Sequence, residues 1–167
     1  LGGSGLYTAF ELPALVSGNI PSMVTDGSKI WVAAESSSGG GGNGGGQGTA
    51  GILQGSFNAS GGIDWEEGWS FPFFTTISDM MMDGTLIYIS TSGNGLYTLD
   101  TTTGTLQRQR GSIHDSLGGL DMHQANGVST LYVGLLGTSS TAAGVQTFDV
   151  ASQQFGSGQL LSGLPSD

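Results

Sequence analysis

The stretch Ile20–Val32 (IPSMVTDGSKIWV) returns without a gap as Ile77–Ile89 (ISDMMMDGTLIYI). In both copies a short apolar run meets an Asp-Gly pair, and an apolar, aromatic, β-branched triplet follows. Asp-Gly pairs supply the positive φ angles that tight hairpin turns require, and aromatic and β-branched residues favour strands. A looser third copy spans Leu117–Val133, with Asn126-Gly127 at its turn. The sequence therefore predicts three related β-hairpins.

A second set of strands follows at regular spacing. Four segments begin at Gly5, Gly51, Gly95 and Gly144, which lie 46, 44 and 49 positions apart. Each alternates as a strand does, and a polar turn with a fourth short strand, such as Thr105–Arg110, follows. Four antiparallel strands at a period near 45 are typical of a β-propeller blade. We therefore predict an all-β fold, a β-propeller segment of three to four four-stranded antiparallel blades.

The repeat divides the chain into five parts. The predicted parts are the second half of a blade at 1–16, a blade with a glycine-rich insert (36–48) at 17–74, blades at 75–112 and 113–162, and the start of another blade at 163–167. The chain opens without Met, so we expect a fragment or a processed chain. A β-sandwich and a β-solenoid are the alternatives, although solenoid coils are usually shorter than this period.

The blade pattern resembles a known family of repeats. Its elements are Gly-Leu-Pro-Ser-Asp at 163–167, the Asp-Gly turns, Ile-Trp-Val at 30–32 and Gly-Leu-Tyr at 95–97. This pattern resembles the propeller repeats in sensor ectodomains of two-component regulators, and it is similar to kelch-like and PQQ-type blades. The resemblance implies a ring of about four to eight blades around a channel. With three to four units and long inserts, this chain would need more chain or more copies to close such a ring.

Composition limits the classes of function. The 167 residues carry a formal net charge of −10, with Lys29, Arg108 and Arg110 as the three cations. Three cations cannot form the basic stripe that nucleic acids require, so we predict no nucleic-acid partner. No apolar run approaches about 18 residues, so we predict no membrane insertion in this segment. The acidic, lysine-poor, Ser/Thr-rich chain favours an extracellular or cell-surface location, and we expect a prokaryotic source.

One aromatic and acidic stretch, Gly62–Phe74, is the candidate ligand site. Aromatic faces beside carboxylates are suited to binding sugars, and the residues that offer them are Trp65, Glu66, Glu67 and Trp69. The competing interpretation is that Trp65, together with Trp69 or Phe71, fills the interface between blades. Asn58-Ala59-Ser60 is an N-glycosylation sequon, which makes Asn58 a candidate glycan carrier.

No residue set predicts catalysis. Glu66 and Glu67 are neighbours on a strand, which places them poorly as a glycosidase pair. His114-Asp115-Ser116 contains the residue types of a triad, but triads are assembled from distant positions. His114 and His123 lack a clear third metal ligand, and the chain has no Cys. We therefore predict no catalytic, cofactor or metal site, and we expect Met80 to fill the core.

The expected function is a non-catalytic extracellular or cell-surface scaffold for adhesion or assembly, as part of a filament or a larger surface protein. Its expected partners are other copies of itself or the remainder of a longer chain, with glycans as further ligands. The alternative is a sensor or a propeller ectodomain that binds a glycan or another small ligand. A propeller-based lyase or glycosidase is a third class, and fold-level similarity does not choose among them.

Overall fold

The computed structural model describes residues 19–35, 50–71, 76–112, 114–138 and 142–160. These residues form three four-stranded antiparallel sheets, and no helix occurs among them. The all-β prediction is thus confirmed, as is the four-stranded antiparallel form of its units. The predicted half blade at 1–16, the insert at 36–48 and the blade start at 163–167 lie outside the described residues.

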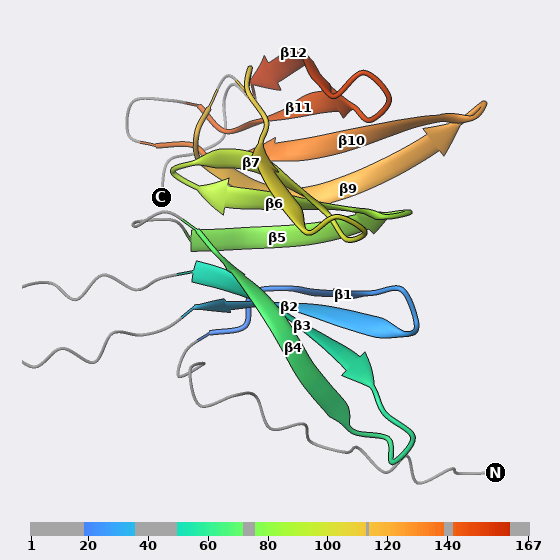
Figure 1. Cartoon of the computed structure of the whole chain (residues 1–167). Helices are drawn as coiled ribbons and strands as arrows, with labels where there is room; N and C mark the ends of the chain where they lie inside the picture. Colours follow the sequence, from blue (N-terminus) through green and yellow to red (C-terminus); the bar gives the residue numbers. More distant parts are fainter. Residues whose placement is uncertain (1–18, 36–49, 72–75, 113, 139–141, 161–167) are drawn as a thin grey trace, which may run out of the picture.

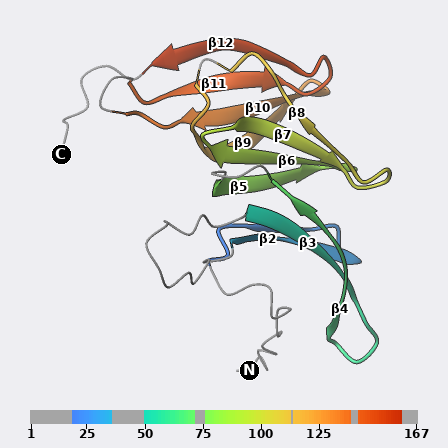
Figure 2. The ribbon, with the colours of Figure 1, turned by 60° about the vertical axis from the view of Figure 1, so that its left-hand side comes forward.

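Each sheet is a meander whose strands lie in chain order. The first sheet contains β1 (Met23–Thr25), β2 (Lys29–Glu35), β3 (Ala50–Phe57) and β4 (Ile63–Ser70). The second contains β5 (Thr76–Asp83), β6 (Leu86–Ser92), β7 (Gly95–Asp100) and β8 (Thr105–Arg108). The third contains β9 (Leu117–Ala125), β10 (Val128–Leu135), β11 (Gly144–Asp149) and β12 (Gln154–Leu160). The sheets are stacked face to face in chain order, with the second in the middle (Figures 1 and 2).

The hairpin turns follow from local chemistry. Gly27, Gly84 and Gly127 have φ values of 91°, 59° and 77°, which glycine adopts without a steric penalty. Asn126 joins Gly127 at positive φ (52°), as a tight hairpin turn requires. Asp26 acts differently, because its Oδ1 accepts the N–H groups of Ser28 and Lys29 at 2.8 and 2.7 Å. The Asp26-Gly27 and Asn126-Gly127 pairs therefore lie in turns, as predicted, whereas Asp83 ends β5 opposite Leu86 and only Gly84 of its pair lies in the turn.

Two apolar clusters join the three sheets. Between the first and second sheets the cluster includes Trp31, Ile52, Phe71, Ile77, Met80, Ile87, Ile89, Tyr97 and Leu99. Between the second and third sheets it includes Tyr88, Leu96, Leu117, Leu120, Leu131, Val133, Leu135 and Phe148. Neighbouring β6 residues such as Ile87 and Tyr88 thus face opposite clusters, as the pleat of a strand dictates. The second sheet is apolar on both faces because a sheet covers each of them.

The first strands of the sheets are joined by a repeated hydrogen bond. The Met80 N–H of β5 donates to Ser22 Oγ, just before β1, at 3.1 Å. The Leu120 N–H of β9 donates to Asp79 Oδ2 of β5 at 2.9 Å. Ser22 Oγ itself donates to Asp79 Oδ1 at 3.0 Å. Ser22 and Asp79 are equivalent positions, since Met23 and Met80 follow them and pair with Val32 and Ile89 in register. Asp79 therefore connects all three sheets.

Candidate functional site

The predicted aromatic and acidic site lies on β4, and a β-bulge decides where its side chains point. Leu53 pairs with Gly68 and Gly55 pairs with Trp65, so Glu66 and Glu67 together lie opposite the one residue Gln54. Such an extra residue breaks the alternation of faces along a strand. A Cβ built on Gly55 would lie 3.0 Å from the Trp65 ring. Trp65 therefore lies on the face of the first sheet that points away from the second sheet.

Glu66 lies on the opposite face, in a network around Trp31. The Trp31 indole N–H donates to Gln54 Oε1 at 2.9 Å, and Gln54 Nε2 donates to Glu66 Oε2 at 2.7 Å. The Ser56 hydroxyl also donates to Glu66, and Lys29 Nζ lies 3.4 Å from Glu66 Oε2. The Ser56 hydrogen bond, followed by that of Gln54, lowers the pKa of Glu66 below its ordinary value. This carboxylate orients the buried polar partner of an interface tryptophan.

Trp69 and Phe71 occupy the interface between the first and second sheets. Trp69 packs against the first cluster, and its indole N–H donates to the Gly104 carbonyl at 2.8 Å. Phe71 is buried and meets Tyr97 edge to face, with ring centroids 5.1 Å apart. Trp69 and Phe71 thus fill the interface between the first and second sheets, whereas the bulge turns Trp65 to the outer face of the first sheet.

The structure does not gather the predicted contact residues into one site. Trp65 and Trp69 lie on opposite faces of the first sheet, and Glu66 is engaged by its own sheet. The side chain of Glu67 lies outside the described part of the structure. Sugar contact by these residues stays a prediction.

Asn58 stands in the turn between β3 and β4. Its Oδ1 accepts the Gly62 N–H at 2.8 Å and the Ser60 hydroxyl at 2.7 Å. Its Nδ2, the atom that would carry a glycan, donates to Asp64 Oδ1 at 2.9 Å. Glycosylation would replace one of the two hydrogens on Nδ2, and the use of this sequon stays a prediction.

The histidines lie apart on the third sheet and the segment before it. His114 Nδ1 is 3.4 Å from the Leu136 carbonyl, and His123 is exposed on β9. Within the described ranges, no group of three or more His, Asp or Glu side chains is arranged to hold a metal ion. The same ranges contain no helix that is long and apolar enough to cross a membrane.

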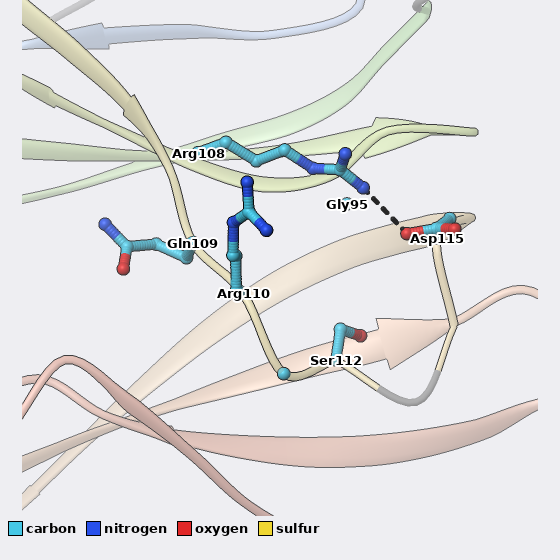
Figure 3. A pocket seen from close by; sticks show the side chains of 7 residues that line it. Gly95, Arg108, Gln109, Arg110, Ser112 and Asp115 are labelled. Carbon is cyan, nitrogen blue, oxygen red and sulfur yellow. Dashed lines mark hydrogen bonds and ion pairs between the residues drawn. The ribbon is translucent and has the colours of Figure 1, made fainter.

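A polar pocket of about 280 Å³ opens where the chain crosses from β8 to β9. It is lined by Gly95, Arg108, Gln109, Arg110, Gly111, Ser112 and Asp115 (Figure 3). Arg108 Nη2 forms an ion pair with Asp115 Oδ1 at 2.8 Å. Arg110 extends toward the same side of the segment as Arg108, while Gln109 points away (Figure 3). Sequence reasoning missed this pocket, although Arg-x-Arg in a chain with three cations was a signal for it.

The two outer faces of the stack expose positions that the internal interfaces bury. Trp31, Tyr88 and Tyr132 occupy one register position, opposite Gln54, Thr98 and Thr147 of the next strand. Trp31 and Tyr88 are 1% and 0% exposed, whereas Tyr132 is 40% exposed. Val145 on β11, which is equivalent to the buried Ile52 and Leu96, is also exposed. At the other end, Met23 is 60% exposed and its equivalent Met80 is 4% exposed.

Comparison of the chain with protein-family models and with curated proteins gives no match.

Proposed function

We propose that the chain is part of a β-propeller that serves as a non-catalytic extracellular or cell-surface scaffold for adhesion or assembly. In this proposal each sheet is one blade. Three features support it: the meander order of each sheet, the side-by-side first strands β1, β5 and β9, and the period of the sequence repeat. Propeller blades share these features, with the first strand of each blade nearest the ring axis.

The observation that carries the proposal is that residues at equivalent positions of the repeat are buried between sheets but exposed on the two outer faces. Tyr132 and Val145 are exposed on the outer face of the third sheet, whereas their equivalents Tyr88 and Leu96 on the second sheet are covered by the third sheet. Met23 is exposed on the outer face of the first sheet, whereas its equivalent Met80 on the second sheet is covered by the first sheet. Burying one large apolar side chain contributes about 1.5–3 kcal/mol. The two outer faces therefore favour association with further blades.

The mechanism of such a scaffold is packing rather than chemistry. A further blade would cover Tyr132 and Val145 just as the third sheet covers Tyr88 and Leu96. That blade belongs to another copy of the chain or to the remainder of a longer polypeptide. The formal charge of −10 keeps the rest of the surface solvated and mutually repulsive.

Light scattering across a range of protein concentrations, combined with intact mass measurement, tests the proposal. We expect the 167-residue chain to self-associate, and we expect Tyr132→Asp to shift it toward monomer. Leu160→Asp is the matched control: Leu160 is comparably exposed, but it pairs with Gly144 and shares the face that Leu135 presents to the second sheet. The control should therefore associate like the parent chain.

Two results would overturn the proposal. One is a monodisperse monomer at every concentration that binds no apolar dye, since such a chain would have no uncovered interface. The other is an equal loss of association in Tyr132→Asp and Leu160→Asp, which would show that a charge added to either face weakens self-association. A native polypeptide mass well above 16.9 kDa would instead support a longer propeller as the source of the next blade.

A further inference from the structure

The pocket at the β8–β9 crossover concentrates positive charge in an acidic protein. Arg108 and Arg110 are two of the three cations in a chain of net charge −10. Asp115 is the one acidic side chain that lines the pocket, so its charged groups leave one net positive charge. Within the described part of the chain, Arg110 forms no ion pair. Charges beyond about 8 Å are largely screened at physiological salt, so this local balance governs the pocket.

The walls of the pocket are held by backbone and buried hydrogen bonds. The Asp115 carbonyl accepts the Gly93 and Gly95 N–H groups at 3.1 and 2.7 Å. The Gln109 N–H donates to the Leu96 carbonyl at 2.8 Å, and its side chain donates to Thr98 Oγ1 at 2.8 Å. Arg110 therefore projects from a segment that is fixed on both sides.

Three further contacts hold the residues that line the pocket. A Cβ built on Gly95 would lie 3.7 Å from Arg108 Nη2, so the guanidinium lies directly over the glycine backbone. Gly111 has a φ of +102° and lies against the Phe155 ring, while Ser112 Oγ donates to Gln146 Oε1 at 3.2 Å. Such pre-ordering reduces the entropy that a ligand would otherwise have to overcome.

We propose that this pocket binds the carboxylate of an acidic sugar, with Arg110 as its anchor. A guanidinium is a planar fork of donors that matches a carboxylate with two parallel hydrogen bonds. One net positive charge in the pocket matches one carboxylate better than a dianion. The oxygens of Asp115 and Ser112 supply acceptors for sugar hydroxyls, and no apolar side chain lines the pocket. Its volume of about 280 Å³ lies just below the usual range of ligand pockets, which suits a single sugar ring.

Calorimetric or NMR titration of the chain with glucuronate tests the proposal, with glucose and acetate as parallel ligands. We expect glucuronate to bind at least tenfold more tightly than glucose, because glucose lacks the carboxylate. We also expect it to bind more tightly than acetate, because acetate lacks the hydroxyls. Arg110→Gln should weaken glucuronate binding at least tenfold, and Arg110→Lys should restore part of it.

Lys29→Gln is the matched control, since it removes the same charge from the first sheet and should leave binding unchanged. Circular dichroism of each variant tests whether the sheets are intact. Equal binding to the parent chain and Arg110→Gln would overturn the proposal, as would an equal loss in Lys29→Gln. Tighter binding of inorganic phosphate than of glucuronate would overturn the assignment to a carboxylate, and equal binding of acetate would overturn the assignment to a sugar.

Discussion

Tyr88 and Tyr132 are tyrosines at the same register position of two neighbouring sheets, yet one is buried and the other is exposed. Tyr88 lies beneath the third sheet, with its ring 6.0 Å from that of Phe148, and Tyr132 lies on the outer face of the third sheet. Burial raises the pKa of the Tyr88 hydroxyl. The residue type is set by the strand position, but its contribution to stability is set by whether another sheet covers it.

Truncation of these two tyrosines should give the largest contrast. Tyr88→Ala should lower the free energy of unfolding by about 3–5 kcal/mol, because it opens a cavity between two sheets. Tyr132→Ala should change it by less than about 0.5 kcal/mol in dilute, dissociated protein, since an exposed ring has little to lose. Urea unfolding of both variants at low concentration measures the difference. A similar loss for Tyr132→Ala would mean that its face is covered in solution.

The hydrogen-bonded joint between the sheets should give an intermediate effect. Asp79→Ala removes the acceptor shared by Ser22 and the Leu120 N–H, and it should cost about 2–3 kcal/mol, as for hydrogen bonds to a charged group. Asp121→Ala on β9 is the control, because that exposed carboxylate accepts a local bond from the Met122 N–H. It should change stability by less than about 0.5 kcal/mol. Equal effects of the two variants in urea unfolding would contradict the role of Asp79.

The smallest expected effect concerns the matching turns after β7 and β11. The Thr102 hydroxyl and N–H lower the pKa of Asp100 below 3.8, and the Ser152 N–H and hydroxyl do the same for Asp149. A carboxyl with a lowered native pKa stabilises the fold above its unfolded pKa, and this stability is lost as pH falls through the native value. We therefore expect the free energy of unfolding to decrease as the pH is lowered below 3.8.

Asn can accept the same turn hydrogen bonds without titrating. Asp100→Asn and Asp149→Asn should each reduce the loss of urea stability between neutral and acidic pH. The comparison is made at pH 7 and again well below the ordinary aspartate pKa. Full acid sensitivity in both variants would show that these turns do not set the pH dependence.

Most strands could be predicted because their signals are local. β7 (Gly95–Asp100) and β11 (Gly144–Asp149) begin at the predicted glycines, since alternation within one strand and a polar turn after it are local signals. The face of Trp65 could not be predicted in this way. It depends on which β3 residues pair with β4, and the bulge opposite Gln54 is a property of that pairing.

The candidate site likewise combines residues that were visible in the sequence with contacts that only the fold creates. Aromatic residues beside carboxylates on β4 were visible in the sequence, but the structure uses Glu66 and Trp69 within the sheet and its interface. Arg108 and Arg110 were equally visible as rare cations. Their shared pocket depends on Asp115 returning to the Gly95 turn, which is a contact made by the crossover and not by either arginine.

The sequence by itself determined the strands, the Asp-Gly and Asn-Gly turns and the period of the repeat, because backbone preference and side-chain alternation act over a few residues. The tertiary structure alone decided which repeated positions are buried, where the bulge turns the β4 side chains and how Asp79 joins three sheets. Those features depend on contacts between residues far apart in the chain, and such contacts form only when the sheets stack.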